Sequence, residues 1–302
     1  MQDSLFTIEL PLVNTDEELK KIKNTYPDCD PYFIASGCIK ERREKFNNLW
    51  NQFKSLADKH FLSQVKKEFH ERTWEMYVGC VFKKYFSDVL SEDNGPDFIL
   101  NKGKIDEIFI EAVACKKGDS ADAVPDMVVA EKPEDITVQD VPHDEMLLRL
   151  SSSLVYKAKK YKDFINTKNK PYIIAVNKGA LEHLDPQIPL VLKCLFGLGY
   201  EHFKKINEQL VYNGWTRREF IEKSNGEKIS MIFFEKDEND FVSAVIYSPG
   251  NILNSPDNIG NDCILIHNPK AKFPIDVKTF YFLQQWKAEY VGAGLEIKKI
   301  EP

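Results

Sequence analysis

The sequence predicts an α/β protein with a central mixed β-sheet flanked by helices, preceded by a helical N-terminal segment. Apolar residues recur with helical spacing over residues 63–90 and again over residues 143–165. Two short β-branched runs lie between these segments, and the apolar run Lys170–Gly179 follows the second of them. A helix, two paired strands, a second helix and a buried strand are typical of a sheet with both parallel and antiparallel neighbours.

The composition predicts a soluble, cytoplasmic protein. No apolar run approaches the roughly 20 residues that a transmembrane helix needs, and the N-terminus lacks the basic and apolar segments of a signal peptide. The six cysteines are widely spaced with no CxxC pair, so we expect buried free thiols and no structural zinc. The net charge of −6 disfavours a protein that coats nucleic acid, but basic runs at 40–43 and 157–162 leave room for a local basic groove.

Two regions are expected along the chain. Residues 1–62 are predicted to form an N-terminal helical extension, with a capping sequence at Asn14–Glu18 and helix breaks at Pro27 and Pro31. Residues 63–302 are predicted to form the α/β domain, with a long polar loop at 116–144. Beyond Gly179 the pattern predicts a helix at Leu190–Leu198, strands at Ile229–Glu235, Phe241–Tyr247 and Cys263–His267, and a terminal helix at Asp276–Val291.

The stretch GPDFILNKGKIDEIFIEAVACKKG reads as a β-hairpin that carries two unexpected carboxylates. Glu111 interrupts the strand Ile108–Ala114, which is otherwise apolar on both faces, and Asp97 begins the partner strand. Pairing of the two strands can bring these carboxylates side by side. A buried carboxylate is costly unless a cation, a proton or hydrogen bonds compensate it. Glu111 is therefore a strand-end surface residue, a paired structural charge or half of a metal site.

The two long helices add further charged residues near their apolar faces. Glu71 and Glu75 fall at the edge of the first helix's apolar stripe, so they either pair with Arg72 or a neighbour or belong to a site. On the second helix Lys157 flanks the apolar face at about 60°, whereas Lys160 points roughly 120–140° away. Lys157 is thus the lysine of this run best placed to reach inward, although lysines often extend outward from such positions.

Together these side chains favour a metal site for phosphate chemistry. Carboxylate oxygens such as those of Asp97 and Glu111 suit Mg²⁺ or Mn²⁺. Such an ion can generate hydroxide from water and stabilise charge on a phosphate, and an adjacent lysine would assist the attacking water or neutralise that charge.

These residues resemble the PD-(D/E)-x-K phosphodiesterase superfamily, which includes the restriction endonucleases. Pro96-Asp97 is similar to the "PD" element, and Glu111 begins the "(D/E)-x-K" element. Glu75 is similar to the acidic residue that the preceding helix often contributes. The resemblance covers roughly residues 65–180. It implies a restriction-endonuclease-like fold, with a central mixed sheet flanked by helices and the site at one sheet edge.

The chain departs from this pattern at Val113, where the family normally has its lysine. Some members supply the cation from another element, and Lys157 is the candidate here. Lys116 and Lys117 lie just beyond the strand and are the second choices. If no lysine reaches the carboxylates, the domain is a catalytically silent relative.

The resemblance implies a metal-dependent nuclease that acts on DNA. Asp97 and Glu111 would bind Mg²⁺ or Mn²⁺, Glu75 would orient the metal or its water, and Lys157 would assist the nucleophile. A homodimer would match the two-fold symmetry of duplex DNA. The alternatives are a silent nuclease-fold protein that binds nucleic acid or a protein partner, and an unrelated metal hydrolase acting on a small phosphoester.

Two further polar residues at strand ends are expected to be structural. His267 has no accompanying catalytic motif, and Asn177 is expected to cap the turn after its strand. The sequence contains no phosphate-cradling glycine motif and no serine-nucleophile motif.

Overall fold

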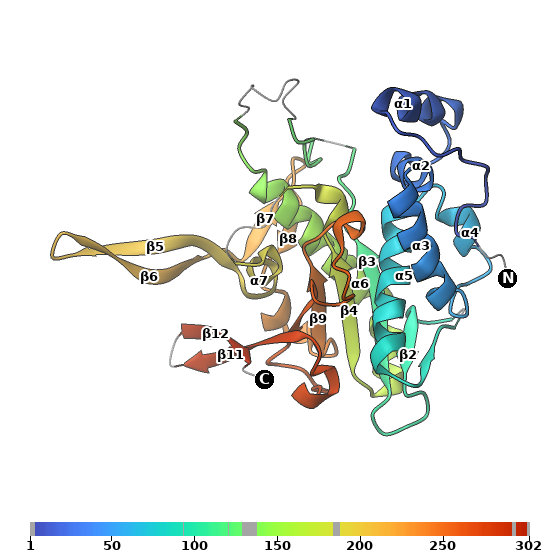
Figure 1. Cartoon of the computed structure of the whole chain (residues 1–302). Coiled ribbons are helices and arrows are strands. Elements are labelled where there is room, and N and C mark those ends of the chain that lie inside the picture. Colours follow the sequence, from blue (N-terminus) through green and yellow to red (C-terminus); the bar gives the residue numbers. More distant parts are fainter. Residues whose placement is uncertain are drawn as a thin grey trace.

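A mixed β-sheet with the strand order β1-β2-β3-β4-β9-β10-β11-β12 forms the centre of the structure (Figure 1). The computed structural model describes residues 4–92, 94–119, 121–128, 138–183, 188–291 and 294–300. β3, β4 and β9 are parallel neighbours, as are β10 and β11, and the other adjacent pairs are antiparallel. The sheet strands are β1 (Val89–Leu90), β2 (Phe98–Leu100), β3 (Ile108–Ala114), β4 (Tyr172–Asn177), β9 (Ala244–Ser248), β10 (Ile264–His267), β11 (Gln284–Val291) and β12 (Gly294–Ile300). The predicted α/β class with a mixed sheet is confirmed.

Helices from the first 85 residues cover one face of this sheet. They are α1 (Asp16–Thr25), α2 (Pro31–Cys38), α3 (Lys40–Phe53), α4 (Phe61–Gln64) and α5 (Phe69–Tyr85). The predicted cap of α1 is present, because the Thr15 hydroxyl accepts from the Glu18 amide and the Glu18 carboxylate accepts from the Thr15 amide. Aromatic side chains such as Phe46 and Trp50 share one hydrophobic core with Ile110 of the sheet. The N-terminal helices and the sheet are therefore joined by continuous apolar packing.

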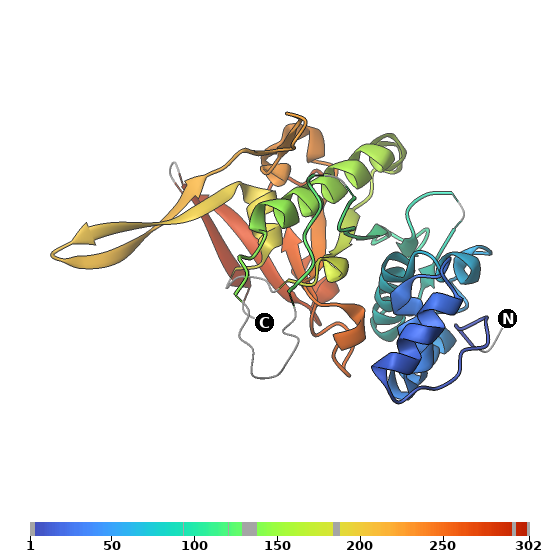
Figure 2. The same ribbon diagram turned by 90° about the horizontal axis from the view of Figure 1, so that it is seen from above.

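α6 (His143–Lys168) and α7 (Leu190–Phe196) pack into a second core on the opposite face of the sheet (Figure 2). Alternation along β3 separates the two cores. Ile108 and Ile110 point toward the N-terminal helices, whereas Phe109 and Val113 pack on the α6 side. Glu111 belongs to the same alternating set as Phe109 and Val113, so its side chain points toward α6.

A long two-stranded ribbon projects from the body of the protein (Figure 1). It consists of β5 (Leu198–Ile206) and β6 (Gln209–Arg217). The turn between them places Asn207 and Glu208 at φ values of 47° and 67°, which matches the twist of a two-residue hairpin turn. The remaining elements are β7 (Phe220–Glu222), β8 (Lys228–Ser230) and the 3₁₀ turns η1 (Gly179–Leu181), η2 (Phe233–Glu235), η3 (Asp237–Asn239), η4 (Ile252–Asn254) and η5 (Val277–Phe280).

Several predicted elements are wrong or too long. The terminal helix predicted at Asp276–Val291 is instead the turn η5 followed by β11, because strand pairing with β10 and β12 outweighs the helical propensity of its Gln, Lys, Ala and Glu residues. The strand predicted at Ile229–Glu235 ends at Ser230, and η2 follows it. The first long helix begins at Phe69 and ends at Tyr85, inside its predicted span of residues 63–90.

All six cysteines are free thiols, as expected, and five of them are buried. Within the described ranges no helix is long and apolar enough to cross a membrane.

Gly79 lies where α5 packs closely against α3 and β2, so a substitution there tests this packing. A Cβ at this position would lie 2.7 Å from two ring atoms of Phe53 and 3.1 Å from the Phe98 ring, and both rings are fully buried. Gly79→Ala should therefore lower the free energy of unfolding by about 1–3 kcal/mol, although alanine is the better helix former. Urea denaturation monitored by circular dichroism measures this change in the free energy of unfolding. Gly250→Ala, where the added Cβ meets only Ser248 Oγ at 3.9 Å, is the control and should change stability by less than about 0.5 kcal/mol. A Gly79→Ala protein as stable as the wild type would contradict the packing described.

Candidate active site at the open edge of β3

The candidate site lies at the start of β2, where β3 runs on without a paired strand on that side. β3 pairs with β2 only at residues 108–110, but it pairs with β4 over residues 109–114. The segment from Glu111 to Ala114 consequently has a strand neighbour on one side only. The edge left open is reached by α6 from one face and by α5 from the other. A cavity of ≈ 240 Å³ lies there, lined by Glu68, Glu71, Arg72, Glu75, Asp97, Glu111, Ala112, Val113, Ala114, Lys157 and Lys160.

Asp97 and Glu111 are tied together at this edge by two hydrogen bonds. The Asp97 amide donates to Glu111 Oε2 at 3.3 Å, and the Ala112 amide donates to Asp97 Oδ2 at 2.7 Å. These bonds extend the β2–β3 ladder past its last backbone pair, Phe98 with Ile110, with carboxylate oxygens replacing carbonyls. The hairpin therefore places the two carboxylates beside each other, as the sequence predicts.

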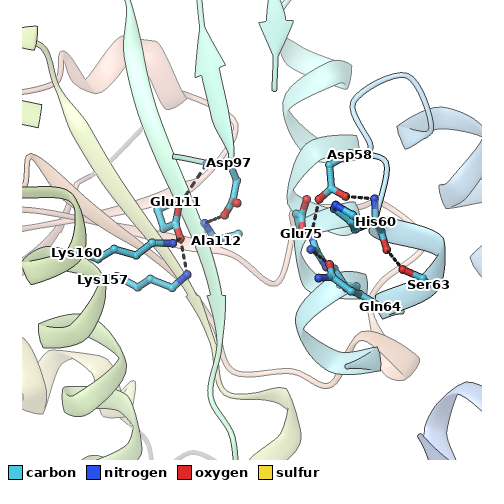
Figure 3. A network of polar contacts seen from close by, with 11 residues as sticks. Asp58, His60, Ser63, Gln64, Glu75, Asp97, Glu111, Ala112, Lys157 and Lys160 are labelled. Atoms are coloured by element: carbon cyan, nitrogen blue, oxygen red, sulfur yellow. Dashed lines mark hydrogen bonds and ion pairs between the residues drawn. The ribbon is translucent and has the colours of Figure 1, made fainter. Parts of the chain in front are cut away.

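α6 supplies cations to Glu111, which is only 1% exposed. Lys157 donates to Glu111 Oε1, and the Lys160 Nζ lies 3.9 Å from the same oxygen (Figure 3). The expectation that Lys157 points inward is confirmed. The expectation that Lys160 points away is wrong, because the long lysine side chain bends back from a position one turn further along the helix.

The carboxylates of α5 are engaged by other cations. Arg72 Nη1 contacts Glu75 Oε2 at 2.6 Å and Asp58 Oδ2 at 3.2 Å, and the Lys116 Nζ lies 3.1 Å from Glu71 Oε2. Figure 3 shows Glu75 on α5, across from the Asp97–Glu111 pair. The ion pairs weighed as an alternative for Glu71 and Glu75 are thus present, and both side chains also line the cavity.

Electrostatics distinguish these carboxylates from ordinary surface groups. Burial and then the neighbouring charge of Glu111 raise the pKa of Asp97 to about 7. Burial and the charge of Asp97 likewise raise the pKa of Glu75 to about 7, against the opposing effect of Arg72. Burial opposes the charge of Lys157, but the Glu111 carboxylate outweighs it and raises the pKa of this lysine. The site therefore holds a carboxyl pair, Asp97 and Glu75, that binds a proton at higher pH than surface carboxylates do, next to a lysine that stays charged.

The second-choice lysines do not reach the carboxylate pair. Lys116 pairs with Glu71. Lys117 pairs with Asp126, and its Nζ also lies 3.0 Å from Glu182 Oε2. Val113 lines the cavity without contributing a charge. Sequence reasoning missed Lys160 as a site residue. Its spacing of three from Lys157 on one helix was the signal that could have identified it.

The two polar residues set aside in the sequence have structural contacts. Asn177 Nδ2 donates to the carbonyls of Ser248 and Gly250 at 3.2 and 2.9 Å, and its Oδ1 accepts from the Gly179 amide at 2.7 Å. His267 Nε2 lies 2.7 Å from Gln285 Oε1, which links β10 to β11. The turn-capping role expected for Asn177 is confirmed.

The oxygen donors of the site fall short of a complete protein cage for a metal. In the part of the chain that the structure describes, no three His, Cys, Asp or Glu side chains are grouped so as to hold an ion by themselves. Comparisons with protein-family models, curated proteins and solved structures find no match to this chain.

The raised pKa values predict how stability depends on pH in metal-free protein. Folded Asp97 and Glu75 retain protons up to about pH 7, whereas unfolded carboxyls lose them near pH 4. The folded state therefore binds more protons between these limits, so the free energy of unfolding should fall by about 2–4 kcal/mol from pH 4.5 to 7 and level off above.

Urea titrations in EDTA at several pH values measure this slope. Asp97→Asn should reduce the slope and match or exceed wild-type stability at pH 8. Asp163→Asn, an exposed carboxylate on α6, is the control and should leave the slope unchanged. Wild-type stability that rises from pH 4.5 to 7 would contradict the assignment.

Proposed function

We propose that this protein is a metal-dependent nuclease that hydrolyses phosphodiester bonds, with DNA as its expected substrate and a restriction-endonuclease-like fold. One observation carries the proposal: Asp97 and Glu111 are held together at an open strand edge with Lys157 bonded to Glu111. The cavity around them is lined mainly by charged side chains, which suits a phosphate and a cation better than an apolar ligand.

The donor set fits a magnesium-type ion. Mg²⁺ keeps several waters and is usually bound by one or two carboxylates together with substrate phosphates, so it does not need three protein ligands. Asp97 Oδ1 accepts no hydrogen bond from the described residues, and burial and the charge of Glu111 raise the pKa of Asp97 despite the opposing effect of Lys157 and Lys160. Asp97 and Glu111 would hold the ion, and Glu75 would reach its waters. When bound, Mg²⁺ or Mn²⁺ would supply charge stabilisation and lower the pKa of a water molecule.

Lys157 acts as a fixed positive charge in this proposal. Its raised pKa keeps the ammonium protonated at neutral pH, so it does not serve as a base. An ammonium at this position stabilises the charge that grows on the phosphate as the water oxygen bonds to phosphorus and the ester P–O bond breaks. Lys160 adds a second, more exposed cation beside the same carboxylate. Together the two lysines of α6 replace the cation that Val113 cannot supply.

Glu75 is suited to handling the proton that the attacking water must lose. Its pKa of about 7 places it near the operating pH, where a group can both accept and release a proton. Arg72 fixes one of its oxygens, which leaves Oε1 without a hydrogen bond from the described residues. This orientation is consistent with a positioned acid or base on α5.

One observation favours a second candidate, a catalytically silent protein on the same fold that binds nucleic acid or a protein partner. Glu111 and Glu75 each already have a cation at bonding distance, so both charges are compensated without a metal. Metal binding separates the two candidates.

Cleavage of plasmid and oligonucleotide DNA in Mg²⁺, Mn²⁺ or EDTA tests the nuclease directly. Wild-type protein should cut only with metal, and Glu111→Gln should lose at least about 10³-fold in rate because it removes a charged ligand of the ion and the carboxylate that positions Lys157. Glu107→Gln, just upstream of β3, is the control and should retain full activity. Asp97→Ala protein that keeps full metal-dependent cleavage after purification to homogeneity would contradict the assignment.

Metal binding also has a readout that does not depend on activity. Saturating Mg²⁺ or Mn²⁺ should raise the thermal midpoint of the wild type by about 2–5 °C, because the ion relieves repulsion between desolvated carboxylates. Asp97→Asn should abolish this shift, and Lys157→Arg should preserve it. No shift in the folded wild type would favour the silent candidate.

A further inference from the structure

The ribbon β5–β6, called the arm below, exposes a cluster of large apolar side chains to solvent. Six of its large apolar side chains are between 43% and 75% exposed: Tyr200, Phe203, Ile206, Leu210, Val211 and Tyr212. An isolated two-stranded hairpin is only marginally stable in water. The arm projects well beyond the rest of the molecule in two perpendicular views (Figures 1 and 2). An exposed apolar patch of this kind marks an interaction surface.

Both faces of the arm are apolar. Directly paired residues share a face, so Phe203 and Tyr212 lie on one face, with ring centroids 5.9 Å apart, and Leu210 lies on the same face. Ile206 and Val211 lie on the other face. A flat surface could cover only one of these faces. The partner must therefore surround the arm.

Charge argues against nucleic acid as this partner. Between residues 198 and 217 the arm carries three cations, Lys204, Lys205 and Arg217, against the two anions Glu201 and Glu208. Arg217 at its base is already paired with Glu235 at 2.6 Å. Proteins that bind nucleic acid concentrate unpaired basic groups along the contacting element. A near-neutral apolar arm fits a protein.

A second copy of the chain offers a matching surface. A groove of ≈ 840 Å³ runs from the arm to the last two strands of the sheet and is lined by Tyr212, Trp215, Trp286, Tyr290, Leu295 and Ile297, with Glu235 and Glu296. We propose that two copies associate by exchanging arms, so that the tip of each arm lies in this groove of its partner. A two-fold axis makes both contacts at once, because the two arms then run antiparallel. The acidic groove residues Glu235 and Glu296 are already paired with Arg217 and Lys298, so apolar contact is what would hold the tip in the groove.

The surface area that two copies would bury by exchanging arms is sufficient for a stable dimer. Each arm strand has nine residues and extends about 30 Å. The six exposed side chains amount to on the order of 600 Å² per arm, and covering both arms with partner surface buries roughly 2,400 Å² in total, above the usual 1,200–2,000 Å² of specific interfaces. This inference is independent of the nuclease assignment, and Glu111→Gln protein should associate normally.

Sedimentation velocity of the full chain tests the exchange. Wild-type protein should be a dimer at about 10 µM, as expected for an interface of this size. The double variant Ile206→Lys/Leu210→Lys, which charges one position on each face of the tip, should weaken the dimer at least 100-fold while keeping the wild-type circular dichroism spectrum. Val277→Lys/Tyr281→Lys, which replaces two exposed apolar residues outside the arm, is the matched control and should remain dimeric.

Mixed disulfides test the tip-to-groove contact itself. Leu210→Cys protein mixed with differently tagged Leu295→Cys protein should form a disulfide between the two variants under mild oxidation, whereas each variant alone should not. A monomeric wild type, or a dimer that the tip variant leaves intact, would overturn the proposal. It would also be overturned if the wild type were monomeric and the tip variant lost binding to DNA or to anionic lipid vesicles, because the arm would then serve that partner.

Discussion

The organisation of this protein depends on a carboxylate buried at the point where one strand loses its neighbour. β3 continues past the start of β2, and Glu111 lies at the first position without a backbone pair on that side. Its charge is tolerated because Lys157 donates to one oxygen and the Asp97 amide to the other. This requirement fixes which face of α6 turns toward the sheet and how the chain enters β2. The sheet edge and both flanking helices are thereby held around one polar cavity.

Stability alone does not account for this arrangement. Buried ion pairs are often no better for stability than apolar residues of similar volume, and Ile110 and Phe109 beside Glu111 show that the same strand accepts apolar side chains on both faces. Asp97 gains a hydrogen bond from Ala112, but burial and the charge of Glu111 leave it with a raised pKa. Desolvated carboxylates set against one another, with a lysine close by, are typical of sites that handle charge during a reaction. In the proposed nuclease, this desolvated cluster of charges would contact the cation and the phosphate.

Local patterns in the sequence predict the centre of the fold well and its periphery poorly. The hairpin that juxtaposes Asp97 and Glu111, the inward orientation of Lys157 and the buried strand β4 follow from periodicity and strand pairing, which involve neighbouring residues. The arm could not be anticipated in this way, because its turn uses Asn207-Glu208 rather than a glycine-containing pair, with Glu208 at a positive φ. β11 carries helix-favouring residues and becomes a strand only through partners that are distant in sequence. Lys160 reaches the site because its side chain is long and flexible, which an idealised helix does not represent.

Crystals soaked in Mn²⁺ would reveal whether Asp97 and Glu111 hold a divalent cation. We expect an anomalous difference peak within ligand distance of the Asp97 carboxylate at the open edge of β3, and no such peak in Asp97→Asn crystals. Wild-type crystals with no peak there, with the Glu111–Lys157 bond unchanged, would contradict this expectation and leave the charged cluster a structural feature.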